Sequence, residues 1–191
     1  MADQIKTLTD QLKQHNYAGV LQTIVCVPEA EKTDALKLLE LVARLKADPN
    51  SPMINHYMNE SSGWVYEQPD QLLSERAFIH LLHQESSPAI RLYQQLGEEN
   101  FNAVDFNRCG NAFLINHDFD QALRCYDRAI ELEPDQPSHR NNKGGALARL
   151  QRFDLALEVY DECLELDPNH TTAKEAKKKL QIKLNQSEDL L

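Results

Sequence analysis

The side chains best suited to chemistry in this sequence are His80 and His83, which lie close together along the chain. On a helix, their spacing places two imidazoles on one face, as two ligands of a single metal ion require. A zinc site needs at least a third protein ligand, and no spacing in the sequence points to one. We therefore expect no metal site and interpret the pair as surface or half-buried histidines.

Motifs that activate a nucleophile or hold a phosphate are absent from the sequence. It contains no GxSxG, no HExxH, no phosphate-binding P-loop and no GxGxxG. The many carboxylates fall on helix faces that we expect to be exposed, where they favour solubility over general acid–base catalysis. The sequence predicts no catalytic residue, no cofactor and no enzyme. An enzyme hidden in residues 1–69 is the least favoured alternative.

Charge and hydropathy limit the partners. The formal net charge is −10, with 30 acidic and 20 basic residues, and such a surface repels the phosphates of nucleic acids. No apolar run approaches the roughly 20 residues of a membrane span, and the N-terminus lacks the pattern of a signal peptide. We expect a cytoplasmic protein that binds neither nucleic acid nor membrane. Its cysteines form no CxxC pair, follow helical patterns and should be small, reduced hydrophobic residues: Cys26, Cys109, Cys125 and Cys163.

An internal repeat dominates the second half of the chain. Residues 103–136 and 137–170 align without a gap and share 12 of 34 positions. The shared positions include the pairs Gly110 and Gly144, Phe119 and Phe153, Ala122 and Ala156, Tyr126 and Tyr160, and Pro134 and Pro168.

Each unit is predicted to be a pair of antiparallel helices. Gly110 and Ala122 are small, so the two helices can approach closely where these residues meet. Pro134 cannot continue a helix and sends the chain into the next unit. Asp118 is a candidate N-cap of the second helix, with Gln121 at the third position of that helix. The aromatic residues expected around the contact are Phe106, Phe113, Phe119 and Tyr126.

These residues resemble the tetratricopeptide-repeat family, whose pattern reads W-x2-L-G-x2-Y, then A-x3-F, then P. The first copy supplies Phe106, Cys109, Gly110, Phe113, Ala122, Tyr126 and Pro134; the second supplies Gly144, Leu147, Ala156, Tyr160 and Pro168. The second copy departs at its first two places, where Arg140 and Lys143 stand. The resemblance implies an all-α fold, in which antiparallel helix pairs stack into a right-handed superhelix that binds other proteins.

The repeats define the expected domain organisation. Residues 70–102 form a divergent repeat, because Ala77, Ala89 and Tyr93 have the same mutual spacing as Gly110, Ala122 and Tyr126. Ser87 should cap the second helix of this unit, with Pro88 in the first turn. Residues 171–185 should form a capping helix whose lysines face solvent, and residues 186–191 a tail.

Residues 1–69 form a less regular helical region in this interpretation. Apolar stripes over residues 5–12 and 17–24 predict two helices that echo a degenerate repeat, and Thr33 should cap a third helix over 34–46. Ser51 and Pro52 should open a short helix. The stretch 60–69 holds the single tryptophan, Trp64, and we expect a loop there, anchored by this side chain or used to bind a partner.

By resemblance, the first helix of each repeat lines a concave groove. Asparagine amides can pair with the backbone of an extended peptide, and arginines can hold its carboxylates. The candidate partner-binding residues are Phe78, Asn107, Arg108, Asn111, Leu114, Ile115, Asn141, Asn142 and Arg149. We do not expect the carboxylate clamp that some family members use on chaperone tails, because only Asn111 and Asn142 match its five positions.

The sequence therefore predicts an adaptor that binds a peptide or a segment of a partner protein in this groove. The alternative is a secretion-type chaperone or a bacterial effector, with a homodimer formed through the N-terminal region.

Overall fold

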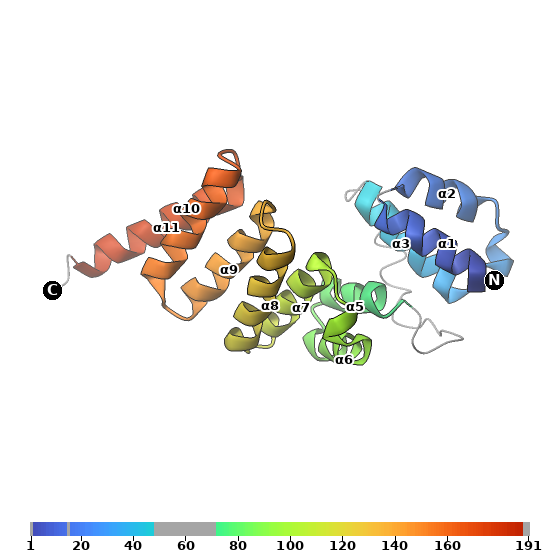
Figure 1. Cartoon of the computed structure of the whole chain (residues 1–191), viewed down its shortest axis with the longest axis horizontal. Coiled ribbons are helices and arrows are strands. Elements are labelled where there is room, and N and C mark those ends of the chain that lie inside the picture. The colour runs from blue at the N-terminus through green and yellow to red at the C-terminus, as the bar shows by residue number, and fades with distance from the viewer. Residues whose placement is uncertain (1, 15, 48–71, 189–191) are drawn as a thin grey trace. The chain divides into compact units, whose positions relative to one another are not determined.

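The computed structural model describes residues 2–14, 16–47 and 72–188, and these residues form helices and turns without any strand (Figure 1). The all-α fold class is therefore confirmed. The chain divides into two compact units, Met1–His83 and Gln84–Leu191. The expected helix at Ser51, the segment around Trp64 and the last three residues lie outside the described residues.

The N-terminal unit contains α1 (Ala2–Lys13), α2 (Tyr17–Val25), the 3-10 turn η1 (Glu29–Glu31), α3 (Asp34–Ala47) and α5 (Leu73–Leu82). The predicted apolar stripes are confirmed, because they are buried together in one core: Ile5, Leu8, Leu12, Val20, Ile24, Leu38, Leu41 and Val42. Asn16 caps α2 by accepting a hydrogen bond from the Gly19 amide, and the Thr33 hydroxyl accepts one from Leu36 at 3.4 Å in the first turn of α3.

A charged group lies within this core. Glu40 on α3 is only 1% exposed, and its carboxylate accepts hydrogen bonds from Lys32 at 2.8 Å and from Arg44 at 2.5 Å. The two cations lower the pKa of Glu40 although burial acts in the opposite direction. The sequence stripe did not indicate this residue, because a glutamate on α3 would be expected on the solvent side.

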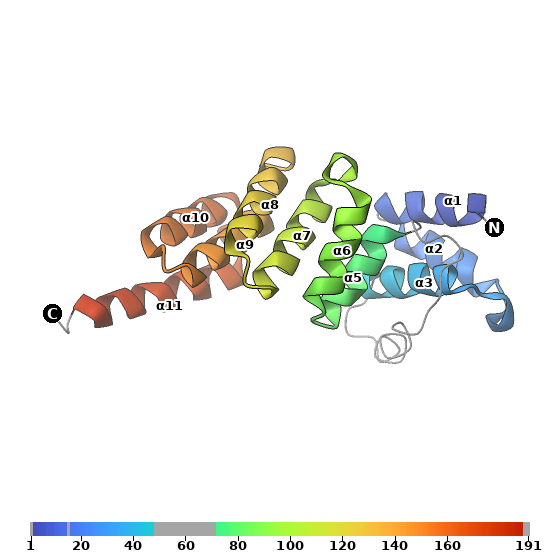
Figure 2. The ribbon, with the colours of Figure 1, turned by 90° about the horizontal axis from the view of Figure 1, so that it is seen from below.

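The C-terminal unit contains α6 (Ser86–Leu96), the 3-10 turn η2 (Glu98–Asn100), α7 (Ala103–Ile115), α8 (Phe119–Leu132), α9 (Pro137–Arg149), α10 (Phe153–Leu166) and α11 (Thr171–Glu188). Helices α7 and α8 form one pair, α9 and α10 the next, and α11 packs on α10 and α9 (Figures 1 and 2). These pairs coincide with the two sequence repeats.

The repeated glycine makes room for the repeated tyrosine. A Cβ atom on Gly110 would lie 2.6 Å from Cε1 of Tyr126, and one on Gly144 would lie 2.7 Å from Cε1 of Tyr160. Real Cβ atoms do not approach carbon so closely, so any side chain at either glycine would displace the ring. The two helices of each pair therefore pack through a ring that lies against a bare backbone.

The two helices of each repeat are joined by the same kind of turn. His117 and Gln151, which occupy the same place in the two repeats, have φ values of 61° and 59°. Each ends the first helix of its repeat in the left-handed conformation, and the next residue donates its N–H back across the turn: Asp118 to Phe113 O and Arg152 to Leu147 O, both at 2.9 Å. The Asp118 carboxylate then caps α8 through the Gln121 amide at 3.3 Å, as the sequence predicted.

One local expectation was wrong. Helix α6 begins at Ser86, so Ser87 lies inside its first turn and does not cap it. Pro88 is tolerated there because the first-turn N–H groups have no partner within the helix. Cys26 is exposed at the C-terminal end of α2, whereas the other three cysteines are buried.

The divergent repeat at 70–102 stays a prediction. Gln84, the residue that would correspond to His117 in that repeat, also has a φ of 61° and follows the end of α5. The predicted repeat nevertheless spans the point at which the two compact units meet, between His83 and Gln84. Its two helices, α5 and α6, therefore belong to different units.

Candidate functional site

Three helices of the C-terminal unit form one continuous surface. Helix α7 contacts α9, and α9 contacts α11, although each pair is separated in sequence by a second helix. We call this surface, made by α7, α9 and α11, the first-helix face. Its residues come from the first helix of each of the two repeats and from the helix that follows them. This arrangement allows one extended ligand to contact all three helices.

Most predicted binding residues lie on the two repeat helices of this face. Helix α7 carries Asn107, Arg108, Asn111, Leu114 and Ile115, and α9 carries Asn141, Asn142 and Arg149. The structure does not place Phe78 in the same unit, because Phe78 belongs to α5. There the Lys46 ammonium lies 5.8 Å from the centroid of its ring. Whether any of these residues contacts a partner stays a prediction.

The asparagine amides are held by other side chains of the unit. Asn142 Nδ2 donates to Asn107 Oδ1 at 3.0 Å, which links α9 to α7, and Asn141 Nδ2 donates to Asn142 Oδ1 at 3.4 Å. The Tyr126 hydroxyl, from α8, donates to Asn111 Oδ1 at 2.8 Å. These bonds use the carbonyl oxygens and fix the orientation of each amide. The Nδ2 groups of Asn107 and Asn111 are left as donors for a ligand.

The predicted apolar contacts differ in exposure. Leu114 is half-buried and packs against the core formed by Ala122, Tyr126 and Ala146. Ile115 is 39% exposed at the end of α7. A ligand side chain could therefore contact Ile115 directly, while Leu114 mainly holds α7 on α8 and α9.

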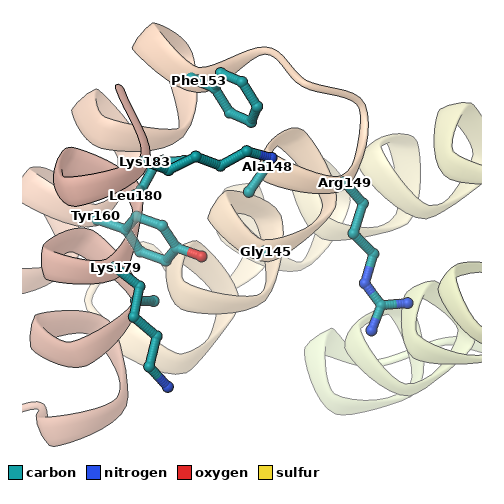
Figure 3. Close-up of a pocket in the computed structure, with 9 residues that line it drawn as sticks. Gly145, Ala148, Arg149, Phe153, Tyr160, Lys179, Leu180 and Lys183 are labelled. Atoms are coloured by element: carbon teal, nitrogen blue, oxygen red, sulfur yellow. The ribbon is translucent and has the colours of Figure 1, made fainter. Parts of the chain in front are cut away.

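A pocket of about 300 Å³ opens between α9, α10 and α11 (Figure 3). Its wall is mostly apolar and includes two lysines of α11. The lining residues are Gly145, Ala148, Arg149, Phe153, Tyr160, Ala176, Lys179, Leu180 and Lys183.

One difference between the two repeats lies in the wall of this pocket. Gly145 occupies the place that Asn111 holds in the first repeat, and Tyr160 occupies the place of Tyr126. With no side chain at position 145, the Tyr160 hydroxyl points past Gly145 into the pocket (Figure 3). Within the described residues it has no hydrogen-bond partner, although Tyr160 is only 4% exposed. Burial raises the pKa of Tyr160, so the hydroxyl stays protonated and can donate a hydrogen bond.

Steric demand does not explain Gly145. A Cβ atom there would have the Tyr160 hydroxyl oxygen at 3.8 Å as its nearest neighbour, which is an ordinary contact. Glycine inside a helix is about 1 kcal/mol less favourable than alanine. The neighbouring Gly144 is required by packing, whereas Gly145 weakens α9 and leaves the pocket open.

Positive charge borders this pocket. No carboxylate in the described part of the chain forms an ion pair with Arg149, Lys179 or Lys183. The Lys183 ammonium lies 4.7 Å from the centroid of the Phe153 ring, a cation–π contact that holds it at the rim. By contrast, Lys177 on the same helix pairs with Asp161 of α10.

The sequence did not indicate this pocket. Phe153 and Tyr160 were interpreted as core residues, and the lysines of α11 as a solvated surface. The signal that was available is the break in the repeat, where Gly145 replaces the Asn111 of the first copy.

The described residues offer little for catalysis. They contain no group of three His, Cys, Asp or Glu side chains that could hold a metal ion. His80 and His83 lie on and directly after α5, without a third ligand among these residues. None of the described helices is long and apolar enough to cross a membrane.

Comparison with known proteins identifies the repeat. A family described as "Tetratricopeptide repeat" matches residues 110–171, which spans the end of α7 through α10. Residues 110–171 are therefore tetratricopeptide repeats. Repeats of this family are generally protein-binding modules without catalytic activity.

Relatives with tetratricopeptide repeats match different shares of this chain. The TPR repeat-containing thioredoxin TTL4 of Arabidopsis thaliana is 35% identical over 54 residues, which are 28% of this chain and only 8% of that protein. The first TPR domain of Spaghetti, solved with the HSP90 peptide SRMEEVD, has a TM-score of 0.56 at 23% identity and covers 63% of this chain and 97% of its own. MamA from AMB-1 has a TM-score of 0.59 at 18% identity, and the match covers 85% of this chain and 96% of MamA. The structural likenesses show the fold of a tetratricopeptide-repeat solenoid.

Proposed function

We propose that this chain is an adaptor that holds an extended segment of a partner protein on its first-helix face. The observation that carries the proposal is the row of fixed side chains along α7 and α9. Asn107 and Asn111 are oriented by Asn142 and Tyr126 before any partner binds. Their Nδ2 donors can bond the carbonyls of an extended backbone, and little side-chain entropy is then lost on binding.

The related structures support this proposal in general terms. The solved Spaghetti domain holds the peptide SRMEEVD, and the second TPR domain of human RPAP3 holds the HSP70 peptide SGPTIEEVD. Both show that this fold binds short segments of other proteins. The five-residue clamp for chaperone tails is incomplete here, since Thr172 and Ala176 of α11 offer no cation, so we propose binding that does not depend on that clamp.

The proposal is tested with two matched variants. Ile115→Asp with Arg149→Glu changes an exposed aliphatic residue and an exposed arginine on the first-helix face. Leu155→Asp with Arg124→Glu makes the same chemical changes on α10 and α8, where both residues are exposed. All four residues are on the surface, so both variants should keep the helical circular dichroism of the parent.

Each protein is immobilised and exposed to cell lysate, and retained proteins are quantified by mass spectrometry. We expect partners of the parent to be lost from the Ile115/Arg149 variant and kept by the Leu155/Arg124 variant. Equal retention by both variants, or selective loss from the second, would contradict a partner site on the first-helix face.

A further inference from the structure

We propose that the pocket between α9, α10 and α11 binds an acidic peptide segment that places a small apolar side chain in the pocket. This inference rests on the proposed function and adds to it the chemical class of the partner. It follows from three features of the pocket: a helix position without a side chain, and, among the described residues, a tyrosine hydroxyl without a partner and cations without counter-charges.

The first feature is Gly145. Asn111, its counterpart in the first repeat, fills the equivalent space with an amide that bonds the tyrosine hydroxyl. Since a Cβ at Gly145 would meet nothing closer than 3.8 Å, packing does not demand glycine at this position. Glycine also weakens a helix interior. The pocket that Gly145 helps to line has a volume of about 300 Å³, enough for a small side chain.

The second feature is the Tyr160 hydroxyl. It is a donor in a mostly apolar pocket, and it has no acceptor among the described residues. A polar group that loses water without gaining a partner is unfavourable. A ligand that enters the pocket therefore has to offer an acceptor to this hydroxyl, and a peptide carbonyl or a carboxylate oxygen does so.

The third feature is the charge around the opening. Lys183 of α11 extends across the pocket toward Phe153, while Lys179 of α11 and Arg149 of α9 turn their charged ends away from the Tyr160 hydroxyl (Figure 3). These three cations stand without ion pairs in the described part of an acidic protein of net charge −10. Other lysines of the same unit are neutralised, such as Lys143 by Asp127 at 2.7 Å. The uncompensated charge therefore selects carboxylates, and Arg149 can bind one of them through two hydrogen bonds.

The apolar wall distinguishes a peptide from a simple anion. Ala148, Ala176 and Leu180 line the space between the cations, together with the Phe153 ring. An inorganic anion would leave this surface in contact with water. A peptide with acidic residues on both sides of an apolar residue can cover the wall with its apolar side chain, accept the hydrogen bond of the hydroxyl, and pair its carboxylates with the cations.

The test uses the full chain and fluorescent heptapeptides measured by anisotropy. The probe has leucine at its centre and glutamate on both sides. Two control peptides replace the glutamates by glutamine or the leucine by glycine. We expect each control peptide to bind about tenfold more weakly than the probe, and inorganic phosphate not to compete at millimolar concentration.

Variants of the chain test whether the probe binds in the pocket. Gly145→Asn should weaken probe binding at least tenfold, because its amide fills the space and accepts the Tyr160 hydroxyl as Asn111 does for Tyr126. Lys179→Gln with Lys183→Gln should weaken it about tenfold as well. Lys174→Gln with Lys178→Gln removes the same charge from exposed positions of α11 outside the pocket and should change it less than twofold.

The outcomes separate this inference from the proposed function. Unchanged probe binding in Gly145→Asn, equal binding of the glutamine peptide, or an equal effect of both lysine pairs would overturn the pocket assignment. The proposed function would still be tested by Ile115→Asp alone, because Ile115 does not line the pocket. The segment 188–191 reads Glu-Asp-Leu-Leu and has the same chemistry, so molar mass is also measured against concentration. If the chain self-associates and Gly145→Asn abolishes this association, the ligand of the pocket is a second copy of the chain. That result would overturn the proposal of a peptide from another protein.

Discussion

Gly144 and Gly145 are adjacent in α9 but meet different surroundings, so alanine at each position should change stability in opposite directions. A Cβ at Gly144 would lie 2.7 Å from the Tyr160 ring, and one at Gly145 would lie 3.8 Å from the hydroxyl oxygen. Both substitutions gain about 0.5–1 kcal/mol because alanine favours a helix. Only the first also overpacks the core, at a cost of about 1–3 kcal/mol.

The expected result is a higher free energy of unfolding for Gly145→Ala and a lower one for Gly144→Ala. Urea unfolding followed by circular dichroism at the helix band measures both. With a slope of about 2 kcal/mol per molar urea, the two midpoints should differ by roughly 0.5–1.5 M. Gly110→Ala, whose Cβ would lie 2.6 Å from Tyr126, is the matched control and should behave like Gly144→Ala.

A stabilising effect of Gly144→Ala equal to that of Gly145→Ala would refute the reasoning. It would mean that the tyrosine ring moves aside without cost, and that the two helices of a repeat are not positioned by this contact. A destabilising effect of Gly145→Ala would show that glycine at 145 serves packing, and would remove one of the three features that support a ligand in the pocket.

Three further predictions concern stability. Asn102→Ala removes the capping box in which the Asp105 amide donates to Asn102 Oδ1 at 2.9 Å, and should lower the free energy of unfolding by about 1 kcal/mol in urea titrations. Glu40→Gln leaves Lys32 and Arg44 without the buried carboxylate and should cost about 3 kcal/mol. Because the folded pKa of Glu40 is lowered from 4.5, its contribution is present above that pH and is lost as the pH falls further, which unfolding at a series of pH values detects. Burial lowers the pKa of His139 below 6.5, so the unfolded chain binds the proton first and the C-terminal unit should lose stability as the pH falls through 6.5. His139→Gln should flatten this dependence, and an unchanged slope would contradict it.

The repeat architecture was predictable from the sequence because its determinants recur at a fixed spacing. Gly110 and Tyr126 meet across one helix pair, and the same two residue types recur at the matching places of the second repeat. The Asp118 cap was also predictable, since a cap depends only on neighbouring residues. Local chemistry and repetition therefore fix the helices and their pairing.

The pocket was not predictable, because it depends on how three helices are rotated against one another. A repeat alignment shows that glycine replaces asparagine at position 145, but not that the Tyr160 hydroxyl then faces an open space. Likewise, the lysines of α11 look equivalent in sequence. The packing of α11 places Lys177 beside Asp161 and Lys183 over Phe153.

The asparagines show a similar limit. Their residue type indicated peptide contact, and the structure shows that they first bond one another and Tyr126. Sequence could not reveal that network, since Asn107 and Asn142 come from different repeats. The homodimer through the N-terminal region and the secretion-type chaperone role stay predictions.

The central claim is that a partner lies on the first-helix face, and site-specific photocrosslinking tests it most directly. A photoreactive amino acid is placed singly at Ile115 or Arg149, and in matched proteins at Leu155 or Arg124. All four positions are exposed, so their crosslinking yields can be compared. We predict that the same partner is crosslinked from positions 115 and 149 and not from 155 and 124. Crosslinking of that partner only from 155 and 124 would place it on the second helices and contradict the account.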